Sequence, residues 1–255
     1  MSIRVGLDLG STAIKAIFTE EGKCLWRGVL PTVPGQEAVA SALINAGLTE
    51  SKRMRGDIAD VVSTGYGKKL FACARANVDE ITANAEGAAK LSGGEARTVI
   101  NVGGQDIKAI RVDERGVVVD FRMNDKCAAG TGRFFELAAR LLDSPISDFD
   151  WLAKNSTEEV ELNSTCAVFA ESEIVSLLAR GIPKEDIAKA LYASVARRIA
   201  GLAGPLCGGE PVYLDGGAAR NRGLAEALED EMMTEVRVFE HPQFTVAYGA
   251  AVSSL

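Results

Sequence analysis

Residues Val5–Gly22 read VGLDLGSTAIKAIFTEEG, and residues Val99–Gly116 read VINVGGQDIKAIRVDERG. Each stretch runs from an apolar, β-branched segment through a glycine-containing turn into IKAI, and then into an acidic turn. Such segments between glycine turns predict strands. A four-residue match alone could arise by chance, but superimposing the IKAI copies also aligns Gly10 with Gly103 and brings the acidic turns together. We therefore predict an internal duplication that builds two similar α/β subdomains.

Helical patterns follow each set of predicted strands. The predicted strands are Ile3–Leu9, Ile14–Thr19, Cys24–Leu30, Asp60–Ser63, Thr98–Val102, Ile107–Val112, Val117–Arg122, Pro211–Leu214 and Val236–Phe239. The predicted helices are Gln36–Ala46, Asp79–Leu91, Gly132–Leu142, Val168–Ala179, Pro183–Ala203, Leu224–Met233 and Val246–Ser253. Gly47 is placed as the C-terminal stop of the first helix, because glycine commonly ends helices. Strands alternating with helices indicate an α/β fold.

The composition argues against several classes of protein. Apolar residues make up 47% of 255 residues, enough for a sizeable core, and the net charge of −7 argues against a broad nucleic-acid or anionic-membrane surface. No segment approaches the roughly 18 apolar residues expected of a membrane span, and we expect a cytoplasmic protein without a signal peptide. Five cysteines, an odd number, argue against a disulfide framework. The single histidine, His241, argues against a His-based triad or metal site.

The first glycine turn carries groups suited to phosphate. Gly10 lets a phosphate approach the backbone, and the turn amides with the hydroxyls of Ser11 and Thr12 can form an anion site. Lys15 could reach a phosphate, and Asp8 could hold a magnesium ion through water. The alternative is a plain hairpin turn.

The second glycine turn could bind phosphate in the same way. It consists of Gly103, Gly104, Gln105 and Asp106. We expect Asp106 to face Asp8 across a cleft. Two carboxylates beside a triphosphate need a cation between them, so magnesium is implied. Asp106 or Gln105 could also orient an attacking water. The alternative is a tight type I′ or II′ hairpin.

A third glycine loop, LDGGAARN, spans Leu214–Asn221. A strand that feeds Gly216 and Gly217 into a helix suits a nucleoside held close to the backbone, with Ala218 and Asn221 beside it. Many α/β turns look like this, so the loop alone is weak. The Walker motif is absent from the sequence, which excludes a P-loop protein.

Together, the three loops resemble the ATPase superfamily of actin, hexokinase-type sugar kinases and heat-shock chaperones. DLGSTAIK resembles its first phosphate motif, VGGQD its second, LDGGAARN its adenosine motif and AYGAAVSS its second connecting helix. The resemblance implies two ribonuclease-H-like subdomains that clamp Mg–ATP in the cleft between them. We expect the first subdomain at residues 1–95 and the second at 96–255. A final helix at about 245–255 should pack back toward the first.

Two cysteines share an unusual setting. Cys127 lies in NDKCAAGTGRF and Cys166 in NSTCAVFAESE, and in both a Cys-Ala step follows polar cap-forming residues and precedes a predicted helix. The positive end of a helix favours thiolate, the form that ligates metals. A cubane iron–sulfur cluster usually needs four thiolates, which two chains related by a two-fold axis would supply. The alternative is that both cysteines merely pack, as expected of Cys24, Cys73 and Cys207, because free cysteines are usually buried.

NDKCAAGTGRF and CAVFAESE closely resemble motifs of the activator ATPases of 2-hydroxyacyl-CoA dehydratases, a group that includes ATPase subunits of benzoyl-CoA reductase. The resemblance implies a homodimer with one bridging 4Fe-4S cluster, and Cys127 and Cys166 match the ligand positions. It also implies ATP-driven electron transfer from a ferredoxin or flavodoxin to an iron–sulfur dehydratase or reductase. Related activators serve double-cubane reductases, and this alternative stays open. A sugar kinase or an actin-like scaffold of the same superfamily would leave the paired Cys-Ala helix starts unexplained.

Overall fold

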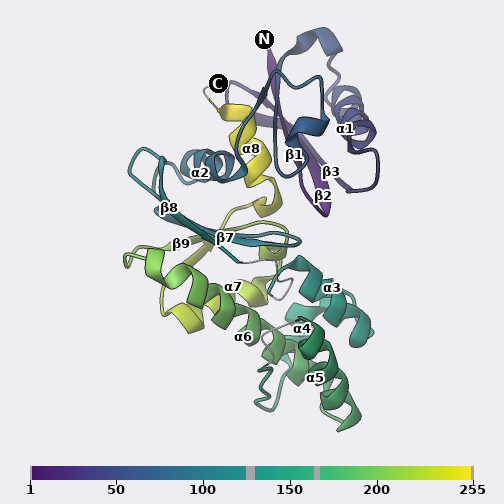
Figure 1. The fold of residues 1–255 in the computed structure, drawn as a ribbon, viewed down its shortest axis with the longest axis vertical. Helices are drawn as coiled ribbons and strands as arrows, with labels where there is room; N and C mark the ends of the chain where they lie inside the picture. Colours follow the sequence, from purple (N-terminus) through teal and green to yellow (C-terminus); the bar gives the residue numbers. More distant parts are fainter. Residues whose placement is uncertain (1, 125–129, 164–166, 254–255) are drawn as a thin grey trace. The chain divides into compact units, whose positions relative to one another are not determined.

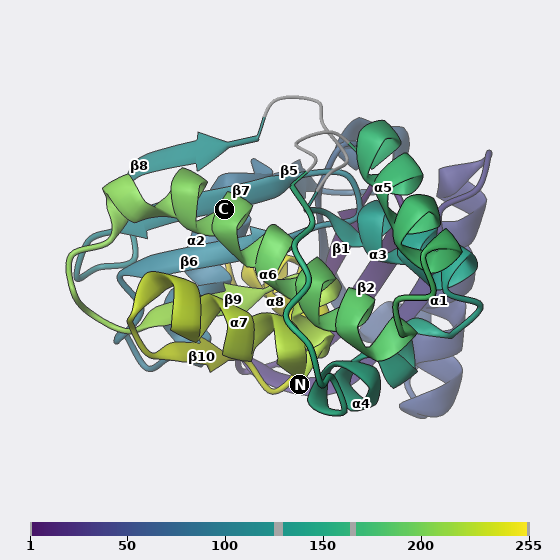
Figure 2. The same cartoon turned by 90° about the horizontal axis from the view of Figure 1, so that it is seen from below.

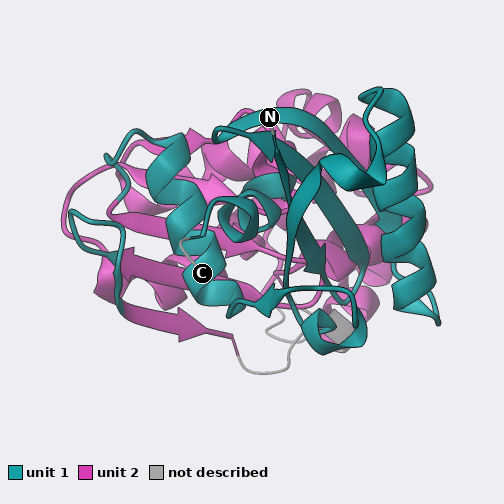
Figure 3. Cartoon of the chain, turned by 90° about the horizontal axis from the view of Figure 1, so that it is seen from above, with its two compact units in different colours: residues 1–96, 112–119, 243–255 teal, residues 97–111, 120–242 magenta. Residues whose placement is uncertain are grey.

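The computed structural model describes residues 2–124, 130–163 and 167–253, apart from the side chains of residues 167 and 168. Two five-stranded sheets organise the chain, one in each of two compact units (Figure 1). Unit 1 comprises residues 1–96, 112–119 and 243–255, and unit 2 comprises residues 97–111 and 120–242 (Figure 3).

The sheet of unit 1 begins with the predicted meander. Antiparallel pairing joins β1 (Ile3–Leu9) to β2 (Ala13–Glu20) and β2 to β3 (Lys23–Pro31). Two parallel strands, β4 (Ile58–Thr64) and β5 (Ala76–Asn77), extend the other edge, so the order is β3-β2-β1-β4-β5.

Helices cover both faces of this sheet. On one face, α1 (Gln36–Glu50) packs its Leu43 and Ile44 against alternate β1 residues such as Leu7 and against Phe18 of β2. On the other face lies α8 (Thr245–Val252), with α2 (Glu80–Leu91) packed beside it. Because strand side chains alternate between faces, β1 presents Val5 and Leu7 to the α1 face and Gly6 to α8.

The sheet of unit 2 repeats the topology of unit 1. Its strands are β6 (Thr98–Val102), β7 (Ile107–Val112), β8 (Val118–Met123), β9 (Val212–Asp215) and β10 (Val236–Val238). Their order, β10-β9-β6-β7-β8, matches β5-β4-β1-β2-β3 position by position. An antiparallel β6–β7 hairpin and parallel β6–β9 and β9–β10 pairs complete the match. The prediction of two similar α/β subdomains is confirmed.

The helices of unit 2 enclose a large apolar core. They are α3 (Gly132–Leu141), α4 (Phe149–Lys154), α5 (Ala167–Ala179), α6 (Lys184–Ala203) and α7 (Arg222–Met232). α6 and α7 lie along the sheet (Figure 2), where Leu191 and Leu224 join Ile100 of β6 in the core. Short 3₁₀ turns lie at Arg55–Asp57, Lys68–Leu70, Ile146–Asp148, Gly204–Leu206, Ala218–Arg220 and Pro242–Phe244.

Two local predictions are wrong, and one short helix has no counterpart among the predicted elements. α1 does not end at Gly47 but continues to Glu50, because Gly47 is buried against the Phe18 and Trp26 rings, where a glycine lets the helix approach the sheet. The short helix α4 was not anticipated. Cys24 and Cys73 are exposed rather than buried. No helix within the described ranges is long and apolar enough to cross a membrane.

Candidate functional site

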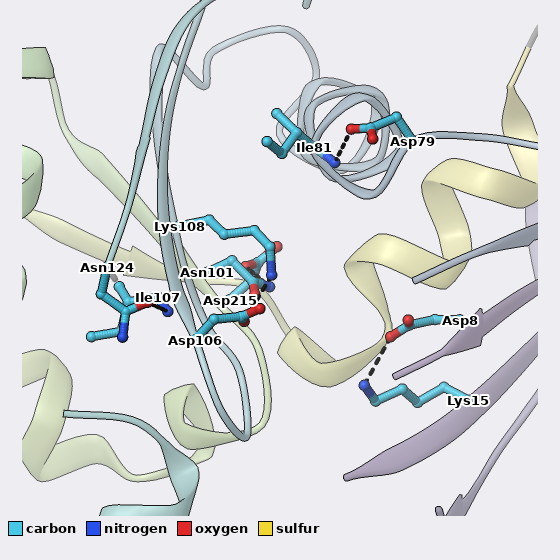
Figure 4. A network of polar contacts seen from close by, with 10 residues as sticks. All are labelled: Asp8, Lys15, Asp79, Ile81, Asn101, Asp106, Ile107, Lys108, Asn124 and Asp215. Atoms are coloured by element: carbon cyan, nitrogen blue, oxygen red, sulfur yellow. Dashed lines mark hydrogen bonds and ion pairs between the residues drawn. The ribbon is translucent and has the colours of Figure 1, made fainter. Parts of the chain in front are cut away.

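The first glycine turn joins β1 to β2 and carries a partly buried ion pair. Asp8 and Lys15 face each other across the hairpin register, and the Lys15 Nζ donates to Asp8 Oδ2 at 2.8 Å (Figure 4). Asp8 is only 3% exposed, and its Oδ1 has no hydrogen-bond partner among the residues the structure describes. A buried carboxylate with one unused oxygen is suited to an added ligand, because unpaired polar atoms are costly to bury.

The backbone around this turn is close-packed. A Cβ added to Gly10 would lie 2.7 Å from the Ala13 carbonyl oxygen and 3.3 Å from Lys15 Nζ. The Thr32 hydroxyl donates to the Gly10 carbonyl at 2.8 Å. Ser11 and Thr12 are half-buried. Glycine at position 10 therefore keeps the lysine and the turn backbone within reach of one small anion.

Sequence reasoning missed a further loop at this turn. Gly65 adopts φ +85°, and a Cβ there would lie 2.6 Å from Asp8 Oδ1. The Gly67 N–H donates to the Leu9 carbonyl at 2.9 Å. The sequence marks TGYG as a glycine-rich turn, but only the parallel pairing of β4 with β1 places this turn at the sheet edge where β1 ends.

The second glycine turn connects β6 to β7 through Gly103–Asp106, four residues rather than the two of a tight type I′ or II′ hairpin. Asp106 is 9% exposed, and it accepts a 2.8 Å hydrogen bond from Lys108 Nζ at Oδ1. Its Oδ2 has no partner within the described residues. Gln105 is exposed, and the Gly103 N–H donates to the Asp106 carbonyl at 2.9 Å.

The third glycine loop lies beside the second turn within unit 2. Because β6 and β9 are parallel neighbours, Asn101 lies opposite Asp215, and its Nδ2 donates to Asp215 Oδ1 at 2.6 Å (Figure 4). Gly216, with φ +91°, packs directly on the Val102 backbone. Both loops thus leave the carboxyl ends of adjacent parallel strands, where open α/β sheets bind ligands.

The remaining predicted residues of the third loop are arranged around a short 3₁₀ turn. Gly217 is exposed and Ala218 is buried. The Asn221 Nδ2 donates to the Ala218 carbonyl at 3.1 Å and so closes the turn on itself. The N-terminus of α7 follows at once, and Asp150 of α4 caps it by accepting from the Arg222 and Gly223 amides at 3.0 Å.

The second turn is also bonded to a helix. The first amides of α3, from Gly132 and Arg133, donate to the Gly103 and Gly104 carbonyls at 2.8 and 3.0 Å. A Cβ on Gly132 would lie 3.2 Å from the Gly104 Cα. Any movement of this turn must therefore move the start of α3 or break these hydrogen bonds.

The cysteines predicted as cluster ligands, Cys127 and Cys166, lie outside the described residues. In sequence, Cys127 stands five residues before α3, and Cys166 directly precedes α5. Across residues 2–124, 130–163 and 167–253, no three His, Cys, Asp or Glu side chains gather as a metal site. The unpartnered oxygen of Asp8 in unit 1 and that of Asp106 in unit 2 are each of the ligand type that magnesium prefers, because this ion binds carboxylate oxygens and water.

A family model described as the BadF/BadG/BcrA/BcrD ATPase family matches residues 5–254, nearly the whole chain and all three glycine loops. The chain belongs to this family. Membership of the BadF/BadG/BcrA/BcrD family makes the chain an ATPase and ATP its nucleotide, and it confirms the resemblance found in the sequence motifs.

Curated members of this family match over almost their full length. An activator of lactoyl-CoA dehydratase from Anaerotignum propionicum is 39% identical, with 97% of this chain and 95% of the relative covered. The (R)-2-hydroxyglutaryl-CoA dehydratase activating ATPase of Acidaminococcus fermentans shows the same identity and coverage. One of the subunits of benzoyl-CoA reductase from Thauera aromatica is 33% identical over 99% of this chain and 93% of its own.

Solved structures also match this chain over almost its full length. Component A of the (R)-2-hydroxyglutaryl-CoA dehydratase of Acidaminococcus fermentans superimposes with a TM-score of 0.93 at 37% identity, covering 98% of this chain and 96% of that one. The ADPNP-bound activator of the 2-hydroxyisocaproyl-CoA dehydratase from Clostridium difficile superimposes with a TM-score of 0.92 at 37% identity, covering 98% of this chain and 92% of that one. A ROK glucokinase from Streptomyces griseus superimposes with a TM-score of 0.57 at 14% identity, with 98% of each chain covered. This likeness shows a shared fold alone. The actin-like ATPase fold is confirmed.

Proposed function

We propose that this chain is an ATP-driven, iron–sulfur electron-transfer activator of a 2-hydroxyacyl-CoA dehydratase or a related reductase. Three relatives at 37–39% identity are activators of such dehydratases, which supports the activator role. The observation that carries the coupling is the pair of backbone hydrogen bonds from α3 to the Gly103–Gly104 turn. They link a nucleotide turn to the helix that follows Cys127 in sequence.

Each glycine loop has a role in holding Mg–ATP. Gly10, Ser11, Thr12 and Lys15 would bind phosphate oxygens from unit 1, and Gly103 and Gly104 from unit 2. Gly216, Gly217, Ala218 and Asn221 would hold the nucleoside. Asp8 and Asp106 would hold magnesium through water, and Asp106 with Gln105 would orient the attacking water. The unpartnered oxygens of both aspartates support this assignment.

Cys127 and Cys166 would supply thiolates to one 4Fe-4S cluster shared by two copies of the chain, since four ligands are usual. When bound, the cluster supplies one low-potential electron. Hydrogen bonds from this chain's own groups, and the exposure those groups allow, would tune its potential. The placement of both cysteines before helices supports thiolate character.

Nucleotide binding would act on these groups through the backbone. If the turn at Gly103–Gly104 closes on phosphate, the α3 amides bonded to it would move with it, and α3 is the helix that follows Cys127 in sequence. Hydrolysis releases the turn and resets the helix, a nucleotide-driven motion of a known kind. A ferredoxin or flavodoxin would provide the electron, and an iron–sulfur partner would receive it. The likeness to the benzoyl-CoA reductase subunit favours a reductase as the second candidate partner.

Anaerobic purification tests the proposal. We expect a brown dimer with about four iron atoms, which reduces a dehydratase partner only when MgATP is hydrolysed. Cys127→Ser and Cys166→Ser should each abolish iron retention, because each removes two of the four ligands in the dimer. The measurements are iron analysis, visible absorption and partner reduction with ATP against ADPNP.

Matched variants separate iron retention from ATP hydrolysis. Cys73→Ser changes an exposed, free cysteine and should retain the iron. Asp106→Ala should impair ATP hydrolysis and leave the iron in place. A colourless wild-type protein, or normal iron content in both cysteine variants, would refute the cluster assignment.

A further inference from the structure

Lys108 is a lysine inside the core of unit 2. Its side chain is 3% exposed, and its Nζ donates to Asp106 Oδ1 at 2.8 Å. Lysine is almost never fully buried unless it is paired. Sequence reasoning assigned no role to this residue, although superimposing the IKAI copies aligns it with Lys15.

The two copies use their lysine differently. In unit 1, Lys15 bonds Asp8, the residue opposite it across the hairpin. In unit 2, the residue opposite Lys108 is Asn101, whose amide donates to Asp215. Lys108 donates to Asp106, a carboxylate that belongs to the turn itself. The ion pair of unit 2 therefore acts directly on a turn that would contact phosphate.

The ion pair determines how Asp106 is presented. With Oδ1 held by a charge-assisted hydrogen bond, the carboxylate cannot rotate freely, and its buried Oδ2 keeps one direction. Figure 4 shows Lys108, Asp106, Asn101 and Asp215 gathered at one end of the sheet. Oδ2 has no partner among the described residues, so it is available to accept a hydrogen bond from water.

We propose that Lys108 is a positioning residue for ATP hydrolysis, which fixes Asp106 so that its Oδ2 accepts a hydrogen bond from the attacking water. The inference rests on the proposed function and adds a residue that acts through Asp106 rather than on nucleotide. Misplacing a group that orients a nucleophile by about 1 Å can cost on the order of 100-fold in rate. Loss of Lys108 should therefore lower kcat while nucleotide affinity stays the same.

The test starts with Lys108→Met, which keeps the length of the side chain and removes its charge. We expect kcat for MgATP hydrolysis to fall by about 100-fold, with an unchanged Kd for MgADPNP by titration calorimetry. Lys184→Met is the matched control, because Lys184 is an exposed lysine of unit 2 that bonds the Ser144 hydroxyl. The control should hydrolyse ATP at the wild-type rate.

A double-mutant cycle decides the mechanism even if Lys108→Met folds poorly, because Asp106→Asn with Lys108→Met removes both buried charges. If Lys108 acts only through Asp106, the double variant hydrolyses ATP no more slowly than Asp106→Asn alone. Multiplicative losses, or a wild-type rate in Lys108→Met, would overturn the inference. A wild-type chain that hydrolyses no ATP would instead overturn the proposed function, and this inference with it.

Discussion

Buried aspartates in this chain differ in what their oxygens contact. In both Asp106 and Asp186 the Oδ2 atom has no partner among the described residues, but Oδ1 of Asp106 pairs with Lys108, whereas Oδ1 of Asp186 accepts three hydrogen bonds from neutral donors. Those bonds come from the Ser156 hydroxyl and the Thr157 and Glu158 amides, at 2.9, 2.7 and 3.1 Å. Asp186 is 1% exposed, and the backbone amides are the first cause that holds its pKa below the ordinary value. The donors identify Asp186 as a structural residue that anchors the loop before α5 to α6.

Replacing Asp186 by asparagine should lower the free energy of unfolding by about 1–2 kcal/mol, because hydrogen bonds to a charged acceptor are stronger than neutral ones. A lowered folded-state pKa adds stability above the unfolded aspartate pKa near 3.9, and this stability is lost as pH falls below that value. Urea unfolding from pH 7 down to about pH 3 should therefore show a shallower acid loss in the variant. Asp230→Asn, at an exposed position of α7, is the control and should match wild type.

At the scale of an element, α1 shows tertiary packing overriding a local helix signal. Gly47 resembles a C-terminal stop, yet the helix continues past it to Glu50, which accepts a 2.7 Å hydrogen bond from Trp26 Nε1. Trp26 and Phe18 form an edge-to-face pair with ring centroids 5.3 Å apart, and both rings lie against Gly47. The glycine is therefore needed for close approach of helix to sheet and not for termination.

Gly47→Ala has two opposing effects on the free energy of unfolding. Alanine favours a helix interior by about 1 kcal/mol, but its Cβ would lie 2.6 Å from Phe18 Cζ and 2.7 Å from Trp26 Cε3. Overpacking typically costs 1–3 kcal/mol, so we expect net destabilisation, measured by thermal and urea unfolding. Gly56→Ala is the control, since no atom lies within 4 Å of an added Cβ there. Equal or greater stability of Gly47→Ala would contradict this account of α1.

At the scale of the whole molecule, the chain leaves unit 1 after Ala96 and completes it with α8 near the C-terminus. α8 approaches α2 and β1 through glycines. An added Cβ would meet the Ala247 backbone at Gly6, the Thr245 backbone at Gly87 and the Ala83 backbone at Gly249. Backbone atoms cannot yield as a flexible side chain can. Unit 1 therefore depends on a contact between residues more than half the chain apart in sequence.

Gly249→Ala should destabilise unit 1 severely, by about 3 kcal/mol or more, at the upper end of overpacking costs. Hydrogen exchange read by mass spectrometry should show protection lost first in α2, α8 and β1. Gly201→Ala, in α6, has open space for its Cβ and should leave the exchange pattern unchanged. If α2 kept its wild-type protection from exchange in Gly249→Ala, the close approach of α8 to α2 would not be needed for the stability of unit 1.

The sequence by itself determined the duplicated α/β architecture and the glycine turns, because strand periodicity, IKAI and turn glycines are local signals. It also singled out Asp8, Lys15 and Asp106 from their positions in those turns. Only the tertiary structure revealed the Gly65–Gly67 loop against Asp8, the Lys108–Asp106 ion pair and the α3 amides on the second turn. These contacts depend on strand register and on which backbones approach closely, and local residue patterns carry no direct record of either.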